Sequence, residues 1–241
     1  MKKGKVVKTL TREQLAKTID QTLLRPTATL QEVQSLCISS KKNHFAAVVI
    51  NPSYVTVAKR ILSGSDVKIC SVVGYPMGAN TIETKVFEAK DNVKKGADEL
   101  DVVINLGMIK SDNFAYIEKE IGIIVSVIRR EQMAEYNKHI NIKIVIEAGA
   151  LEKDEIKKIC KIVEESGADF IKTSTGFGNR GVELDDVRLI REVVTRNIGV
   201  KAAGGIQTFK DAQALIDAGA TRLGTSSGLN IIEEYIELFG K

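Results

Sequence analysis

The sequence predicts an α/β protein in which parallel strands alternate with helices. Short apolar segments and longer amphipathic segments follow each other eight times along the chain, and such alternation is typical of parallel sheets. Eight units in 241 residues fit a sheet closed into a TIM (β/α)8 barrel, with a short N-terminal helix and one domain over residues 1–241. A doubly wound open sheet is the alternative, but no G-x-G-x-x-G turn opens an early helix.

The expected strands are short and rich in Val and Ile. Residues 45–50 are apolar throughout, as in a strand buried on both faces. Residues 167–172 combine a glycine at a helix end with a short strand that carries Lys172 near its end. In chain order the expected strands are 18–24, 45–50, 67–74, 99–105, 141–148, 168–172, 200–203 and 222–226.

The expected helices begin at recognisable signals. Thr11 and Thr29 each open a capping box. Asn51 followed by Pro52 fits an N-cap and a first helical position. In chain order the helices are expected to start near residue 11 and then to cover 29–42, 52–62, 81–95, 114–138 in one or two pieces, 152–166, 184–197, 209–218 and 229–238.

Several charged residues are predicted to point into the barrel. Side chains alternate between the two faces of a strand, so the apolar residues of 99–105 face the helices while Asp101 and Asn105 face the interior. Mutual ion pairing explains such a polar interior without any chemistry, because buried charges must be paired. The candidates for this interior are Asp101, Lys143, Glu147, Lys172 and Lys201.

Lys172 has two opposed interpretations. A lysine near a strand end can bend outward and keep its ammonium in water. A lysine buried in the barrel tends instead to lose its proton, and the neutral amine is a nucleophile for carbonyl carbon. Helix-ending glycines lie five residues before both Asp101 and Lys172, which predicts that these two side chains reach similar heights in one lumen.

Two glycine-rich loops predict a phosphate site. Gly204 and Gly205 follow the seventh expected strand, and the sequence G-T-S-S-G at 224–228 follows the eighth. Loops after these two strands of a barrel offer backbone N–H groups and a helix N-terminus to phosphate. Either loop alone also fits a tight turn that needs glycine, but the pair in these two places favours a phosphorylated ligand.

Composition argues against several other classes of function. Cys37, Cys70 and Cys160 lie far apart, which argues against a disulfide framework or a zinc ribbon, and His44 and His139 lack metal-ligand spacing. The net charge is only +4, and no basic stripe with interleaved aromatics indicates nucleic-acid binding. Because neither a signal peptide nor a membrane-spanning run is found, we expect a cytoplasmic protein that binds no nucleic acid and no membrane.

Several segments, spread over nearly the whole chain, resemble a known family. The motif K-T-S-T-G at 172–176 together with K-x-x-G-G at 201–205 is highly specific. The chain resembles the deoxyribose-phosphate aldolases of the class I, Schiff-base-forming type. The resemblance implies reversible cleavage of 2-deoxy-D-ribose 5-phosphate to D-glyceraldehyde 3-phosphate and acetaldehyde, in deoxyribonucleoside breakdown. The segments are 19–20, 51–54, 74–80, 96–105, 167–177, 201–206 and 219–228.

The resemblance also implies roles for individual residues. Lys172 would form the Schiff base, Lys201 would favour the neutral amine of Lys172 by like-charge repulsion, and Asp101 would donate and accept protons. No metal and no cofactor is implied. The expected partners are small phosphosugar and aldehyde substrates and further copies of the chain, in a dimer or tetramer. The residues implied in substrate or phosphate binding are Gly204, Gly205, Ser226, Ser227, Thr175 and Asp20. Asp20 is also expected to hydrogen-bond within the network of Lys172, Lys201 and Asp101.

Some positions depart from patterns common in the family. Gln21 stands where many relatives have His, and Val49 where some have Cys. Ala148 and Ala203 replace Thr and Ser, and the C-terminal Tyr of some relatives is missing. These departures bear on aldehyde preference and rate. Two alternatives stay open: another phosphosugar lyase or transaldolase-like barrel with the same imine chemistry, and a catalytically silent phosphosugar-binding barrel.

Overall fold

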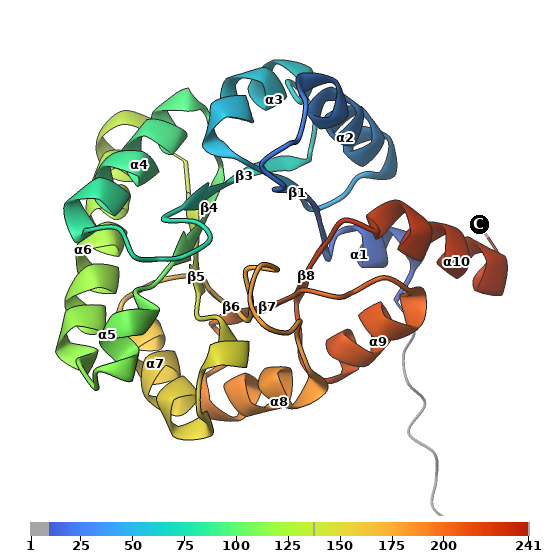
Figure 1. Ribbon diagram of the computed structural model, residues 1–241. Coiled ribbons are helices and arrows are strands. Elements are labelled where there is room, and N and C mark those ends of the chain that lie inside the picture. Colours follow the sequence, from blue (N-terminus) through green and yellow to red (C-terminus); the bar gives the residue numbers. More distant parts are fainter. Residues whose placement is uncertain (1–9, 137, 241) are drawn as a thin grey trace, which may run out of the picture.

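In the computed structural model, which describes residues 10–136 and 138–240, the chain forms a closed β-barrel inside a ring of helices (Figure 1). Within those residues eight parallel strands hydrogen-bond in chain order, and β1 (Ile19–Leu23) closes the barrel against β8 (Arg222–Thr225). The predicted TIM barrel is confirmed, and the open sheet is excluded.

Each strand overlaps the segment predicted for it, and most are shorter than predicted. The strand that carries Lys172 is only three residues long. Short strands leave long loops at the carboxyl ends of the barrel, where Lys172 lies. The strands between β1 and β8 are β2 (Ala47–Ile50), β3 (Lys68–Val73), β4 (Glu99–Val103), β5 (Asn141–Val145), β6 (Phe170–Lys172) and β7 (Gly199–Ala203).

The helices cover the outside of the barrel (Figure 1). Over the described residues, none of them is both long enough and apolar enough to cross a membrane. In chain order they are α1 (Arg12–Ala16), α2 (Leu30–Asn43), α3 (Val55–Ile61), α4 (Ile82–Lys95), α5 (Leu106–Lys110), α6 (Phe114–Glu131), α7 (Lys153–Glu165), α8 (Leu184–Val193), α9 (Phe209–Asp217) and α10 (Gly228–Phe239).

Three helical segments differ from the prediction. The unpredicted α5 begins where the Asn105 side chain accepts a hydrogen bond from the Met108 N–H at 3.2 Å. α8 ends earlier than predicted, because the guanidinium of Arg191 donates to the carbonyl of Ile198 across the following turn. The segment predicted at 114–138 is α6 followed by a π-turn, η2 (Gln132–Tyr136), and residue 137 lies outside the described residues.

The predicted helix caps are mostly confirmed. Thr11 and Thr29 form complete capping boxes, in which each hydroxyl accepts a backbone N–H and the side chain three residues later returns a hydrogen bond. Asn51 occupies the predicted N-cap position before Pro52, but the first turn is a 3-10 turn, η1 (Pro52–Tyr54), which leads into α3. The Asn51 side chain makes no cap hydrogen bond and instead donates to the Leu24 carbonyl at 3.4 Å.

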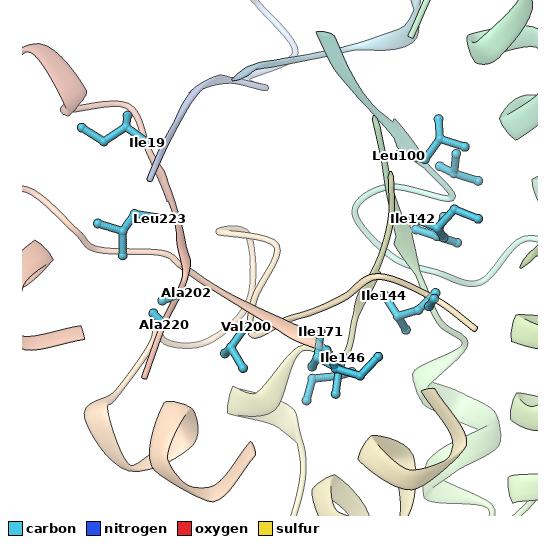
Figure 2. Close-up of a cluster of buried hydrophobic side chains, with 14 of the residues drawn as sticks. Ile19, Leu100, Ile142, Ile144, Ile146, Ile171, Val200, Ala202, Ala220 and Leu223 are labelled. Atoms are coloured by element: carbon cyan, nitrogen blue, oxygen red, sulfur yellow. The ribbon is translucent and has the colours of Figure 1, made fainter. Parts of the chain in front are cut away.

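Apolar side chains fill the layer between the barrel and the helices. Ile19, Leu100 and Ile142 are fully buried in this layer and point away from the barrel interior (Figure 2). This is the outward face that the alternation in the sequence predicts. Burying one side chain of this size stabilises a fold by about 1.5–3 kcal/mol, so this layer is the main hydrophobic core.

The barrel interior is divided into an apolar side and a charged side. The apolar side lies at β1, β2 and β3, and Tyr75 packs against it. Charged side chains fill the remainder of the interior, as described below. The buried residues of the apolar side are Leu24, Ala47, Val49, Cys70 and Val72.

Gly78→Ala should destabilise the fold more than Gly64→Ala. Both glycines have left-handed φ angles, 67° and 69°, so alanine at either position carries a similar backbone penalty of about 1–2 kcal/mol. A Cβ at Gly78 would lie 2.1 Å from the carbonyl oxygen of Ile104, whereas a Cβ at Gly64 meets nothing within 4 Å. In denaturant titration we expect Gly78→Ala to lose at least about 2 kcal/mol more unfolding free energy than Gly64→Ala. Equal losses would contradict a role for this close packing.

Candidate active site

A cavity of about 420 Å³ opens at the carboxyl ends of the strands. Its walls follow β1, β6, β7 and β8, at the end of the barrel where the loops of this fold bind ligands. The segments that line it are 22–25, 172, 175–177, 203–207 and 224–226.

Lys172 lies at the inner end of this cavity. Only 2% of its surface is exposed, and its Nζ lies 2.8 Å from Oδ2 of Asp101. The Tyr75 ring centroid lies 5.3 Å from the same nitrogen. The structure therefore excludes the interpretation in which Lys172 bends outward into water, and both Asp101 and the cavity are within reach of its amine.

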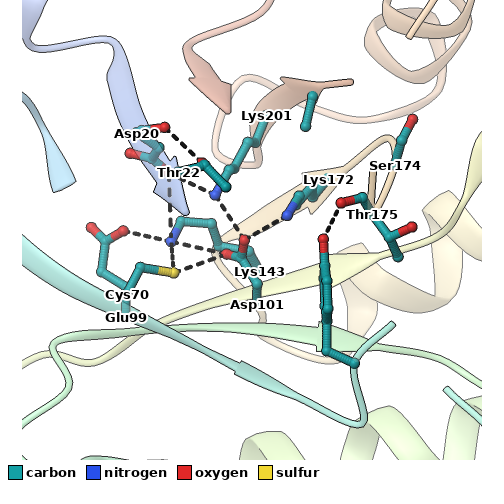
Figure 3. Close-up of polar contacts among 12 residues, drawn as sticks. Asp20, Thr22, Cys70, Glu99, Asp101, Lys143, Lys172, Ser174, Thr175 and Lys201 are labelled. Carbon is teal, nitrogen blue, oxygen red and sulfur yellow. Dashed lines mark hydrogen bonds and ion pairs between the residues drawn. The ribbon is translucent and has the colours of Figure 1, made fainter. Parts of the chain in front are cut away.

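Asp101 connects three lysines inside the barrel (Figure 3). Its Oδ2 accepts hydrogen bonds from Lys172 and Lys201, both at 2.8 Å. Its Oδ1 lies 3.2 Å from Nζ of Lys143 and accepts the thiol hydrogen of Cys70 at 3.1 Å. Burial acts to raise the pKa of Asp101, but the three ammonium groups hold that pKa well below its usual value. Asp101 is therefore a carboxylate at neutral pH.

A second set of ion pairs surrounds Asp101. Lys201 also pairs with Asp20 at 2.7 Å, and Lys143 pairs with Glu99 at 2.5 Å. Arg222 pairs with both Asp20 and Glu99, and its Nη2 lies 2.9 Å from Oε2 of Glu99. Burial opposes the ionisation of Asp20, yet the neighbouring Arg222, Lys201 and Lys143 lower its pKa below the usual value. The network therefore continues across the whole charged side of the barrel.

The network holds more basic than acidic groups. Among the described residues it contains four basic side chains and three carboxylates. Although burial acts to lower them, the pKa values of Lys143 and Arg222 are raised by the acidic groups around them. The network therefore has one basic group more than its carboxylates can pair one to one, and each carboxylate is shared between basic groups. The basic members are Lys143, Lys172, Lys201 and Arg222, and the acidic members are Asp20, Glu99 and Asp101.

Strand register brings these side chains together. Lys172 on β6 is the partner position of Lys201 on β7, which is in turn the partner of Arg222 on β8. Asp101 on β4 is the partner of Lys143 on β5. The structure thus brings together four of the predicted interior residues, because inward positions on neighbouring strands fall at similar heights.

Sequence reasoning missed three members of this cluster. Glu99 lies two residues before the inward Asp101, and Arg222 lies at the start of β8. Alternation along β4 is enough to predict Glu99, because residues two apart on a strand share one face and Asp101 points inward. In the sequence Cys70 only argues against a disulfide framework or a zinc ribbon. In the structure its thiol contacts both Asp101 and Lys143, and burial raises the pKa of this thiol to about 12. In residues 10–136 and 138–240, no three His, Cys, Asp or Glu side chains are grouped as metal ligands.

Glu147 does not belong to the ion-pair network, contrary to the prediction. Its φ of 50° lies in the left-handed region, so the strand alternation no longer applies. Its Oε2 accepts hydrogen bonds from the Thr175 N–H at 2.9 Å and from the Thr175 hydroxyl. Glu147 therefore fixes the loop that follows Lys172. The prediction that Asn105 faces the interior is also wrong, because its side chain caps α5.

Two aromatic side chains lie near Lys172: Phe177 lines the cavity, and the Tyr75 ring packs beside the amine. The rings of Tyr75 and Phe177 pack edge to face, with centroids 5.9 Å apart. The Tyr75 hydroxyl donates to the Thr175 carbonyl, and the Phe177 N–H donates to the Thr175 hydroxyl oxygen at 3.0 Å. Burial raises the pKa of Tyr75 well above its usual value, so its hydroxyl stays protonated. These contacts hold the aromatic wall in one position.

The residues predicted to bind substrate separate into two groups. Gly204, Gly205, Ser226 and Thr175 line the cavity. Asp20 is fully buried in the ion-pair network and does not line it. The expected place of Asp20 in the lysine network is therefore confirmed by its ion pair with Lys201. Its implied contact with substrate is corrected, because it does not line the cavity.

Ser227 is likewise not among the residues that line the cavity. It occupies the N-cap position of α10, and its N–H donates to the Thr225 hydroxyl at 2.9 Å. The loop before it is fixed by Gln21, whose side-chain amide donates to the Ser226 carbonyl at 3.1 Å and accepts the Gly228 N–H at 3.0 Å. Gln21, noted in the sequence only as a departure from the family, thus shapes the candidate phosphate loop.

Asp20→Asn should destabilise the protein far more than Asp66→Asn. Asp20 is buried between Arg222 and Lys201, and removing one partner of a buried ion pair costs about 3–5 kcal/mol. Asp66 pairs with Lys17 on the surface, with 47% of its side chain exposed, so its loss should cost at most about 1 kcal/mol. Free energies of unfolding from denaturant titration give both values.

The pH dependence of the unfolding free energy checks the Asp20 ion pairs independently. Because the folded-state pKa of Asp20 is lowered, its contribution to stability is present above the unfolded-state pKa of roughly 3.9 and is lost as the pH falls through the folded-state value. The stability difference between wild type and Asp20→Asn should therefore shrink on acidification below about pH 4. A difference that stays constant with pH would contradict the ion-pair account.

Comparisons with known proteins agree with this geometry. Residues 14–234 match the model of the DeoC/LacD family aldolases. The chain is similar to the deoxyribose-phosphate aldolase of Caldanaerobacter subterraneus subsp. tengcongensis, with 48% identity over 221 residues, 92% of this chain and 93% of that protein. It is also similar to the tetrameric deoxyribose phosphate aldolase structure from Aeropyrum pernix, with a TM-score of 0.84, 31% identity, and coverage of 95% of this chain and 93% of that one. The chain therefore belongs to the DeoC/LacD family of aldolases.

Proposed function

We propose that this barrel is a class I aldolase that reversibly cleaves 2-deoxy-D-ribose 5-phosphate to D-glyceraldehyde 3-phosphate and acetaldehyde through a Schiff base on Lys172. One observation carries the proposal. Of the basic side chains described in the buried network, only Lys172 also lines the cavity. Relatives from Caldanaerobacter subterraneus and Clostridium perfringens that are named deoxyribose-phosphate aldolase, at 48% and 43% identity, support the choice of sugar.

The charge balance of the network supports a neutral amine at Lys172. With all four basic groups protonated, the described network has one positive charge in excess. Loss of a proton from Lys172 removes this excess, and Lys172 is the member from which a proton can leave into the cavity. A neutral amine is the form that attacks a carbonyl carbon. Lys201, bound to the same oxygen of Asp101, disfavours a second ammonium beside it.

In the proposed reaction, Nζ of Lys172 attacks C1 of the open-chain sugar, and loss of water from the carbinolamine leaves a protonated imine. The imine withdraws electrons from the C2–C3 bond, which breaks when a base removes the proton of the C3 hydroxyl. Glyceraldehyde 3-phosphate leaves, and the enamine is protonated at C2 and hydrolysed to acetaldehyde. Asp101 is the proposed proton carrier, acting through a water, because its carboxylate lies 2.8 Å from Nζ.

The glycine loops would hold the phosphate at the other end of the cavity. Gly204 and Gly205 have positive φ angles of 97° and 80°, which suit a loop that turns its backbone N–H groups toward one ligand. Ser226 lines the same end, beside the start of α10. Fixing the phosphate there would place the sugar chain along the cavity toward Lys172, and such positioning is a large part of catalysis.

The wider setting is also proposed. We infer one catalytic domain over residues 1–241 that acts in the cytoplasm in the breakdown of deoxyribonucleosides. The tetrameric relative from Aeropyrum pernix supports self-association, as a dimer or a tetramer.

Borohydride trapping tests the Schiff base. With acetaldehyde and borohydride, one amine hydrogen of the wild-type protein should be replaced by an ethyl group, a net gain of C2H4, and peptide mapping should place it on Lys172. Lys172→Ala should lose this adduct, whereas Lys161→Ala, which removes an exposed lysine of α7, should retain it. Absence of an adduct in the wild-type protein would favour the catalytically silent barrel.

The substrate is tested separately, by release of glyceraldehyde 3-phosphate from 2-deoxy-D-ribose 5-phosphate. Lys172→Ala should reduce kcat by at least about 10⁴-fold, because nucleophile and electron sink are lost together. Circular dichroism controls for folding. Trapping without turnover of this sugar would favour another phosphosugar lyase with the same imine chemistry.

A further inference from the structure

We infer that Arg25 is a specificity-determining residue whose guanidinium binds the phosphate of the substrate, and that Glu32 holds it at the cavity mouth until the substrate arrives. This inference rests on the proposed function and adds to the candidate phosphate site a residue outside the glycine loops. It follows from the position of the loop after β1, from the charges that line the cavity, and from the contacts of Arg25 itself.

The loop after β1 lies beside the candidate phosphate loops. Strand β1 pairs directly with β8, with Gln21 in register with Thr225. The side chain of Gln21 also ties β1 to the loop after β8 through the Ser226 carbonyl. Residues 22–25, which continue from β1, line the same cavity as 203–207 and 224–226. Arg25 is therefore at the end of the cavity where the phosphate is proposed to bind.

Few charged side chains line the cavity, although the phosphate of the proposed substrate carries about two negative charges. Among the described residues that line it, the only basic side chains are Lys172 and Arg25, and none is acidic. Lys172 is engaged with Asp101 at the inner end and is needed as a neutral amine. The loops after β7 and β8 offer only neutral donors. Arg25 is thus the charged group available to the phosphate, and the planar guanidinium binds phosphate through two parallel hydrogen bonds.

The contacts of Arg25 allow its guanidinium to leave Glu32 and bind a phosphate in the cavity. Its Nη2 pairs with Oε1 of Glu32 on α2, and the two side chains are 47% and 42% exposed. An exposed ion pair contributes little to stability and exchanges readily with a competing anion. Oε2 of Glu32 independently accepts the Thr29 N–H at 2.8 Å and the Thr29 hydroxyl at 2.9 Å. The capping box of α2 therefore remains intact when Arg25 leaves Glu32.

Arg25→Ala should raise KM for 2-deoxy-D-ribose 5-phosphate by about 10- to 100-fold, the range expected when a charge-assisted phosphate contact is lost. Its kcat/KM for 2-deoxy-D-ribose, which has no phosphate, should stay within about twofold of wild type. Arg188→Ala is the matched control, because Arg188 also forms an exposed ion pair, with Asp185, but does not line the cavity. It should change neither value.

Glu32→Gln tests the holding role. Glutamine preserves the capping box but removes the charge that retains Arg25, so KM for the phosphorylated sugar should fall by about two- to fivefold. The double variant Arg25→Ala/Glu32→Gln should resemble Arg25→Ala. An unchanged KM in Glu32→Gln would overturn the holding role.

Equal losses by Arg25→Ala on both sugars, or an unchanged KM, would overturn the phosphate contact. If the wild-type protein does not turn over 2-deoxy-D-ribose 5-phosphate, the proposed function fails, and calorimetric titration with inorganic phosphate then decides on Arg25. Weaker phosphate binding by Arg25→Ala than by Arg188→Ala would support the inference, and equal binding would overturn it.

Discussion

One carboxylate oxygen, Oδ2 of Asp101, holds the candidate site together. It accepts hydrogen bonds from Lys172 and Lys201 at the same distance, and so links β4 to β6 and β7 across the barrel. The contact fixes the orientation of the Lys172 side chain before any substrate binds. It also brings the amines of Lys172 and Lys201 to one fully buried acceptor. The contact that orders the interior thus also places the amine of Lys172 beside the carboxylate that is proposed to carry protons.

The apolar side of the barrel strengthens these contacts. Val72 on β3 lies beside Asp101 on β4, and Val49 on β2 continues the apolar side away from the ion pairs. In a medium of low dielectric constant, both attraction and repulsion between charges increase. Val49 fits this role because its side chain is apolar and fully buried. The apolar side of the barrel interior therefore strengthens the interactions among the charged side chains on the other side.

The sequence predicts the barrel and the inward direction of Asp101 and Lys143 well, because alternation along a strand depends only on local geometry. It leaves the direction of Lys172 open. The helix-ending glycines also predict similar heights for Asp101 and Lys172, which are in contact, but the heights of other residues are predicted poorly. Asp20 is implied both in the lysine network and in substrate binding, and register sets it opposite Gly224, in the network and below the loop that carries Ser226. Glu147 was misplaced because its left-handed backbone ends the alternation. Both errors arise from register and backbone torsion, which no residue pattern specifies.

Hydrogen bonds fix the loops after β6 and β8, whereas one exposed ion pair holds Arg25 in the loop after β1. This difference matches the kind of phosphate contact that is proposed for each loop. Glu147 fixes the loop after Lys172 through Thr175, and Gln21 fixes the loop after β8. Neutral donors bind through geometry, so they are useful only if they are rigid before the ligand arrives. A guanidinium attracts an anion over a longer distance and tolerates mobility. A cation held by one exposed ion pair at the cavity mouth, above rigid neutral donors, is therefore a consistent arrangement for capturing a phosphate and then positioning it.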